Sequence, residues 1–182
     1  MNDRINGNLQ GARLFLAAVP DTHTAARIHR LAGTLKRAHR LTGRLIPDDR
    51  LHVSLFFLGG LHEDGVRKVC EAAEATTAMP FDISFDRTAS FRGKRANHPF
   101  VLFGDRGLRA LNAFRQTLAE AMMRRGLRRW ANTSFAPHVT LFYGDRRVEE
   151  YPILPIGWTV RELVLIRSMR GHVRLAQWPL SG

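Results

Sequence analysis

The chain has 182 residues, of which 45% are hydrophobic and 24% charged, and this composition excludes a disordered or fibrous protein. The length fits one domain of two small intertwined lobes over 1–182, with a flexible start at 1–10. The formal net charge is +12, and nearly all of the 28 basic residues are arginines. Because guanidinium groups match phosphate oxygens, this charge favours a nucleic-acid partner, although a general compositional bias toward arginine explains it equally well.

Cysteine content and hydropathy indicate where the protein works. The only cysteine is Cys70, which excludes a disulfide framework and makes a reducing cytoplasm the simplest location. The longest early apolar run, 14–19, ends at Pro20 and is too short to cross a bilayer or to form a signal-peptide core. We therefore expect a soluble cytoplasmic monomer that does not associate with membranes.

The predicted elements, taken in chain order, mix strands with helices. An apolar run at 13–19 predicts a strand, and Asp21 is placed to cap a helix over 24–41. The further strands are predicted over 51–58, 81–91, 99–104, 138–143, 159–168 and 172–178, and the further helices over 64–77 and 107–125. Strand and helix do not alternate strictly, as they do in a doubly wound parallel sheet, so we predict an α+β fold built on antiparallel sheet.

Two of the predicted strands carry the same four-residue pattern. His52-Val53-Ser54-Leu55 and His138-Val139-Thr140-Leu141 each contain a histidine, a valine, a hydroxyl residue and a leucine. Side chains alternate across a strand, so each histidine shares a face with the hydroxyl two residues later. One copy alone is most simply a half-buried strand with a satisfied histidine. Two copies in one small chain are far less expected by chance, and they suggest that pseudo-twofold symmetry brings both imidazoles to one cleft.

A pair of imidazoles with adjacent hydroxyls suits in-line displacement at phosphorus. The attacking and leaving oxygens lie on opposite sides of the phosphorus, so one group takes a proton while another supplies one. Histidine, with an ordinary pKa near 6.5, performs either task at neutral pH. Hydroxyls beside it can donate hydrogen bonds to the non-bridging oxygens. We therefore predict His52 and His138 as catalytic residues, with Ser54 and Thr140 binding the substrate phosphate.

These residues resemble the 2H phosphoesterases, and among them the RNA 2′,3′-cyclic phosphodiesterases that are also called 2′-5′ RNA ligases. The likeness extends to five further segments: 13–17, 56–59, 135–137, 163–168 and 178–180. The resemblance implies a bilobal fold, with two pseudo-symmetric lobes of antiparallel sheet, flanking helices and a central catalytic cleft. It also implies hydrolysis of an RNA-terminal 2′,3′-cyclic phosphate to a 2′-phosphate, and reversible 2′-5′ ligation in vitro, without a metal or other cofactor.

The resemblance assigns His52 as the proton donor and His138 as the proton acceptor. Two positions depart from the family's usual pattern. Ser54 stands where threonine is commoner, which keeps the hydroxyl. Tyr143 stands where close relatives often have arginine, so a phosphate contact is absent there or comes from another residue.

Several further residues have two interpretations. Strict alternation places Phe56 and Phe142 on the histidine faces, where their rings would bind substrate by stacking on a base, but packing in the core is the simpler reading. The basic loop with Arg92, Lys94 and Arg95 either follows an RNA backbone or is a solvated turn. The other histidines form no metal-binding spacing, and no glycine-rich phosphate-binding motif occurs in the sequence.

Two alternatives to the RNA enzyme remain open at this point. The same chemistry fits a small substrate, such as a cyclic nucleotide or an ADP-ribose cyclic phosphate. A non-catalytic RNA-binding protein would account for the basic charge alone, and it would lose no turnover when both histidines were replaced.

Overall fold

The computed structural model describes residues 13–93, 97–169 and 171–181. The predicted flexible start at 1–10 and the loop residues Lys94 and Arg95 lie outside these ranges. The strands are β1 (Arg13–Ala18), β2 (Val53–Gly59), β3 (Phe81–Ser90), β4 (His98–Phe103), β5 (His138–Gly144), β6 (Tyr151–Val160), β7 (Glu162–Ser168) and β8 (His172–Pro179). The helices are α1 (Thr22–Ala38), α2 (Glu63–Glu74), α3 (Arg109–Arg124) and α4 (Arg128–Ala131), with short 3-10 turns η2 (Asp48–Arg50) and η3 (Arg106–Leu108).

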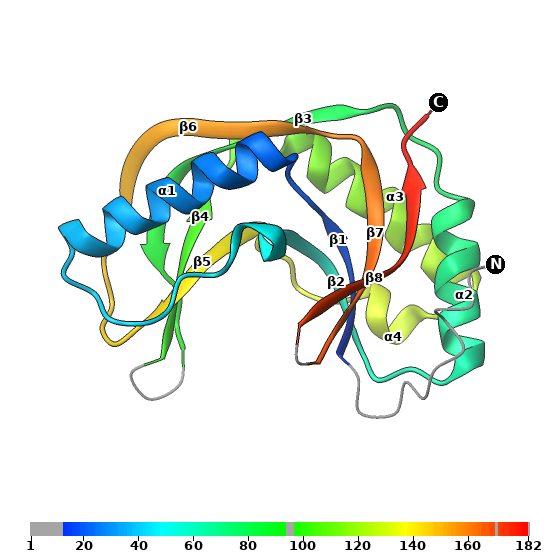
Figure 1. Ribbon diagram of the computed structural model, residues 1–182. Helices are drawn as coiled ribbons and strands as arrows, with labels where there is room; N and C mark the ends of the chain where they lie inside the picture. The colour runs from blue at the N-terminus through cyan, green and yellow to red at the C-terminus, as the bar shows by residue number, and fades with distance from the viewer. Residues whose placement is uncertain (1–12, 94–96, 170, 182) are drawn as a thin grey trace.

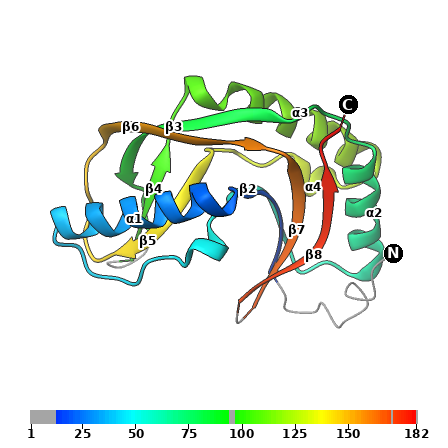
Figure 2. The same ribbon diagram turned by 45° about the horizontal axis from the view of Figure 1, so that its top comes forward.

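The strands form one open antiparallel sheet that divides into two lobes. Its order is β6-β3-β4-β5-β2-β1-β7-β8. The central strands β5 and β2 are joined through one pair of residues, Val53 and Val139, whereas the pairs on either side have long ladders. The sheet therefore consists of a β6-β3-β4-β5 lobe and a β2-β1-β7-β8 lobe that meet at the two motif strands (Figures 1 and 2). The predicted α+β fold with two lobes of antiparallel sheet is confirmed.

Helix α1 shows how the two lobes are tied together. The Asp21 carboxylate caps it by accepting hydrogen bonds from the backbone N–H of Thr24 at 2.9 Å and from the Thr24 hydroxyl at 2.7 Å. Its buried face includes Ala25, Ile28 and Ala32, spaced three and four residues apart. Although α1 follows β1 in the chain, it packs against β5 and β6 of the opposite lobe (Figure 1).

The two faces of the sheet differ in what covers them. The main apolar core fills the helix-covered face. On the opposite face of β1 and β7 lies a small separate cluster of Phe15, Ala17, Val164 and Ile166. We call this second surface the histidine face, because the two motif histidines belong to it.

Helix α4 and most of strand β6 were not predicted from the sequence, and the strand predicted over 159–168 is divided between the end of β6 and β7. Strand β6 contains Pro152, Pro155 and Gly157, which together read as a loop. It forms one edge of the sheet, and Pro155 lies in an irregularity of its pairing with β3; edges and irregularities are the places where a sheet tolerates proline. Within the described ranges, no helix is long and apolar enough to cross a membrane.

Candidate active site

The two histidines flank the single residue pair that joins the lobes. His52 directly precedes β2, and His138 opens β5. Because β2 and β5 are antiparallel at Val53 and Val139, continuing the register by one residue sets His52 across from Thr140 and His138 across from Ser54. A local twofold axis thus passes between the two valines, and it relates the two imidazole and hydroxyl pairs on one face of the sheet.

Both imidazoles are oriented by the same kind of hydrogen bond. The Nδ1–H of His52 donates to the carbonyl of Arg50 at 2.7 Å, and the Nδ1–H of His138 donates to the carbonyl of Ala136 at 2.7 Å. A carbonyl oxygen only accepts, so each Nδ1 keeps its proton and each Nε2 is the atom that gains or loses one. The Ser54 hydroxyl lies 3.0 Å from Nε2 of His52, where it donates to the neutral imidazole.

The surroundings of His52 disfavour its charged form. Its ring stacks on Phe15 with centroids 4.7 Å apart and meets His172 edge to face at 5.1 Å. Burial lowers the pKa of His52 from 6.5 to about 4; repulsion from His172 and His138 adds to this effect, and the hydrogen bond to the Arg50 carbonyl opposes it. In the free protein at neutral pH, His52 is therefore neutral.

His138 has an aromatic neighbour of its own. The ring centroid of Phe91, which follows β3, lies 5.1 Å from that of His138. Arg92, the next residue along the basic loop, is exposed. The part of that loop that the structure describes therefore begins beside the second histidine.

A β-bulge in β2 removes Phe56 from the histidine face. Ala17 of β1 faces Ser54, whereas the preceding Leu16 faces Phe56, so Leu55 is an extra residue in β2. The side chain of Phe56 is 1% exposed and packs under the guanidinium of Arg115, 4.3 Å from the ring centroid.

An equivalent bulge occurs in β5. Val101 of β4 faces Thr140 and Phe100 faces Phe142, which leaves Leu141 as the extra residue. Phe142 is fully buried and stacks on Phe100 with ring centroids 5.0 Å apart. The structure therefore corrects the expected placement of Phe56 and Phe142, because one extra residue in each strand turns both rings into the core.

The carbonyls of the bulge residues find partners outside the strand ladders. Nε of Arg115 donates to the Leu55 carbonyl at 3.0 Å, and the backbone N–H of Ile46 donates to the Leu141 carbonyl at 2.8 Å. A buried carbonyl without a partner is costly, so these two bonds stabilise the bulges.

Two other aromatic residues occupy the histidine face instead. Phe57 lies directly opposite Phe15, whose ring stacks on His52, and Phe57 is 59% exposed. Tyr143 lies opposite Pro99, two residues from the partner of Thr140, and is 46% exposed. Sequence reasoning missed Phe57, since 55–58 is apolar throughout and its pattern contains no sign of a bulge. The two exposed rings are related by the same pseudo-twofold symmetry as the histidines.

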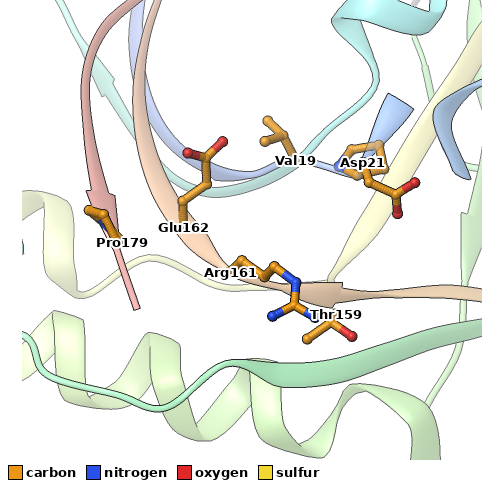
Figure 3. A pocket seen from close by; sticks show the side chains of 7 residues that line it. Val19, Asp21, Thr159, Arg161, Glu162 and Pro179 are labelled. Carbon is orange, nitrogen blue, oxygen red and sulfur yellow. The ribbon is translucent and has the colours of Figure 1, made fainter. Parts of the chain in front are cut away.

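A separate pocket lies where β1 ends and β6 turns into β7 (Figure 3). It has a volume of about 560 Å³ and is lined by Val19, Pro20, Asp21, Thr159, Arg161, Glu162 and Pro179. Both of its carboxylates have partners, since Asp21 caps α1 and Glu162 pairs with Arg174 at 2.9 Å. No motif histidine lines this pocket, so it is distinct from the paired histidines at the lobe junction. Among the described residues, no group of three or more His, Cys, Asp or Glu side chains could hold a metal ion.

Several solved structures share this fold. Escherichia coli LigT complexed with 3′-AMP matches with a TM-score of 0.74 and 22% identity, covering 94% of this chain and 99% of LigT. The protein TT0787 of Thermus thermophilus matches with a TM-score of 0.70 and 20% identity, covering 92% of this chain and 97% of that protein. The PDE domain of MHV ns2 gives a TM-score of 0.53 at 22% identity and covers 82% of this chain and 97% of that domain.

The sequence itself matches a family over most of its length. Residues 20–172, which include both histidine motifs, match the 2′-5′ RNA ligase superfamily. No curated protein matches the chain. The chain belongs to the 2′-5′ RNA ligase superfamily of 2H phosphoesterases, and this membership supports an enzyme that acts on phosphodiester bonds.

Proposed function

We propose that this protein hydrolyses the 2′,3′-cyclic phosphate at the end of an RNA to a 2′-phosphate, by metal-independent acid–base catalysis with His52 and His138. The observation that carries the proposal is the paired geometry at the lobe junction. Two imidazoles related by a twofold axis each hold Nδ1–H on a backbone carbonyl and leave Nε2 for proton transfer. In-line displacement requires one such group on each side of the phosphorus.

The proposed reaction transfers two protons in opposite directions. Nε2 of His138 takes a proton from water as the water oxygen bonds to phosphorus. The bond from phosphorus to the ribose 3′-oxygen breaks, and Nε2–H of His52 protonates that oxygen. The products are a 2′-phosphate and a free 3′-hydroxyl. The Ser54 and Thr140 hydroxyls donate to the non-bridging oxygens, where negative charge grows in the transition state.

The role of His52 as the acid depends on the substrate. Its pKa of about 4 in the free protein leaves it neutral at pH 7. A bound phosphate anion next to Nε2 favours the imidazolium and raises this pKa, so the acid becomes charged when the substrate binds. His52 thereby gains its proton in the complex rather than in the resting protein.

The exposed aromatic residues support a nucleotide as the substrate. Phe57 and Tyr143 lie at opposite ends of the row of motif side chains on the histidine face. A base on either side of the phosphate can stack on one of these rings, which is the usual way proteins hold unpaired bases. The net charge of +12 favours a polyanion over a neutral ligand.

The same pose also accounts for ligation. When the 5′-hydroxyl of a second RNA replaces water as the nucleophile, its oxygen bonds to phosphorus as the bond to the 3′-oxygen breaks, so the 2′-oxygen remains on phosphorus and a 2′-5′ linkage forms. Hydrolysis to a 2′-phosphate and ligation through the 2′-oxygen are therefore expected to share one active site.

The test is turnover by the purified protein in EDTA. An RNA oligomer ending in a 2′,3′-cyclic phosphate is compared with adenosine 2′,3′-cyclic phosphate and with ADP-ribose 1″,2″-cyclic phosphate. The proposal expects the highest kcat/KM for the oligomer, whereas a higher value for either small substrate would assign the enzyme to small molecules. RNA binding without turnover, unchanged when both histidines are replaced by alanine, would identify a non-catalytic RNA-binding protein.

A further inference from the structure

A third histidine lies against the proposed acid. His172 opens β8 and pairs with Ser168 at the end of β7. Its half-buried ring lies 5.1 Å from that of His52 and 5.4 Å from that of Phe15, centroid to centroid. Within the described part of the chain, neither ring nitrogen of His172 has a hydrogen-bond partner. His172 therefore faces the site with an unused polar group.

An arginine approaches the same place from η2. The carbonyl of Arg50 orients His52, and the half-buried Arg50 side chain extends to Gly171, just before β8. Nη2 of Arg50 is 3.2 Å from the position that a Cβ on Gly171 would occupy. Among the described residues, the Arg50 guanidinium has no carboxylate partner within ion-pair distance.

The charges at this corner are not balanced in the free protein. Burial, and then the positive charge of Arg50, lower the pKa of His172, while the carboxylate of Asp49 acts in the opposite direction. Asp49 is exposed, so solvent screens its effect. A half-buried cation without a counter-ion, next to two imidazoles, attracts an anion.

The strand order separates this corner from the position of the scissile phosphate. In the proposed function, the scissile phosphate lies between His52 and His138, on the β5 side of β2. His172 lies on the other side of His52, because β8 follows β1 and β7 in the sheet. An anion held by Arg50 and His172 is therefore a second group, adjacent to the first.

We propose that Arg50 and His172 form a second phosphate subsite, which takes the phosphate one ribose away from the scissile one. The proposal rests on the proposed function, in which His52 and His138 hold the scissile phosphate. The guanidinium donates two parallel hydrogen bonds to the phosphate oxygens, and the imidazole donates one. The substrate class is thus a nucleotide with phosphate on both sides of the terminal ribose, such as an oligonucleotide end.

Equilibrium binding tests the subsite without turnover. Adenosine 2′-phosphate and adenosine 2′,5′-bisphosphate are titrated calorimetrically, in phosphate-free buffer, into the wild type, Arg50→Gln, His172→Gln and the control Arg109→Gln. Arg109 is exposed on α3, and its substitution removes the same charge outside the corner. All variants are first checked for a cooperative melt, and Arg50→Lys serves as a second variant that keeps the charge.

The wild type and Arg109→Gln are expected to bind the bisphosphate about tenfold more tightly than the monophosphate, the effect of one charge-assisted contact. In Arg50→Gln and His172→Gln this ratio falls to about twofold or less, with little change for the monophosphate. Arg50→Lys keeps part of the preference for the bisphosphate over the monophosphate, because it keeps the positive charge. Equal affinities in the wild type, or an unchanged preference in Arg50→Gln, would overturn the subsite.

Kinetics then distinguish the two sources of the second phosphate. With a dinucleotide ending in a cyclic phosphate, Arg50→Gln raises KM about tenfold if the subsite takes an internucleotide diester. An unchanged KM together with a lost bisphosphate preference assigns the subsite to a terminal 5′-phosphate. If Arg50→Gln lowered kcat/KM equally for the dinucleotide and for adenosine 2′,3′-cyclic phosphate, Arg50 would act at the scissile phosphate and the proposal would be refuted. If the wild type turned over neither substrate, the proposed function would fail, while the binding experiment would still decide the subsite.

Discussion

Lowering the pH should destabilise the protein through His52. Its pKa is about 4 in the folded chain, against 6.5 for an ordinary histidine. Because the folded pKa is depressed, the unfolded chain binds more protons, so the stabilisation is complete above 6.5 and is lost as the pH falls toward 4. Between about pH 7.5 and pH 5, this one group should lower the free energy of unfolding by roughly 2 kcal/mol.

Urea unfolding of the wild type and His52→Gln measures this effect. Both proteins are studied at each pH in buffer without phosphate, since a bound anion would raise the pKa of His52. The glutamine variant lacks the titrating imidazole, so its stability should fall by roughly 2 kcal/mol less over the same interval. Other groups, including His172, titrate in both proteins, so their contributions largely cancel when the stability losses of the two proteins are subtracted. Equal losses in the two proteins would show that His52 is not desolvated as the structure indicates.

Three further predictions concern catalysis, folding and binding. Replacing His52 or His138 by alanine should lower kcat by roughly 10²- to 10⁴-fold, and the double variant should lose less than the product; near-full activity of either single variant would refute the pairing. Arg115→Met should reduce the free energy of unfolding in urea by roughly 1 to 3 kcal/mol, because the Leu55 carbonyl loses its partner; an unchanged midpoint would contradict this. Phe57→Ala should raise KM for an RNA oligomer roughly tenfold or more with little change in the melting temperature, and a loss of stability with normal KM would count against a stacking role.

The fold class and the two motif strands were predictable from the sequence. The repeated pattern of His52 and His138 alone indicates two equivalent strands, each with a polar face, and the structure sets these strands side by side. Recognising this repeat requires no knowledge of long-range contacts, because each copy shows the same alternation of buried and exposed residues in its own local sequence.

A specific physical reason explains why the aromatic residues on the histidine face could not be predicted from the sequence. A bulge of one residue inverts every later side chain in a strand, and it arises where an outside group satisfies the extra carbonyl. For β2 that group is Arg115, which is distant in the sequence, and for β5 it is the backbone of Ile46. Periodicity within 51–58 therefore could not distinguish Phe56 from Phe57.

His172 was also not predictable as a neighbour of the site. It lies outside both motifs, and its contact with His52 depends on the pairing of β7 with β1 and β8. Long-range strand pairing of this kind leaves no mark on the local sequence.

The most direct test of the account is phosphorus NMR of an RNA oligomer ending in a 2′,3′-cyclic phosphate, incubated with the protein in EDTA. The account predicts that the cyclic phosphate signal is replaced by that of a 2′-phosphate, at a rate that EDTA does not affect and that falls roughly 10²-fold or more in His52→Ala and His138→Ala. A product that is mainly 3′-phosphate would show that the substrate binds in the opposite orientation. Activity that disappears with EDTA and returns with a divalent metal would contradict the two-histidine mechanism itself.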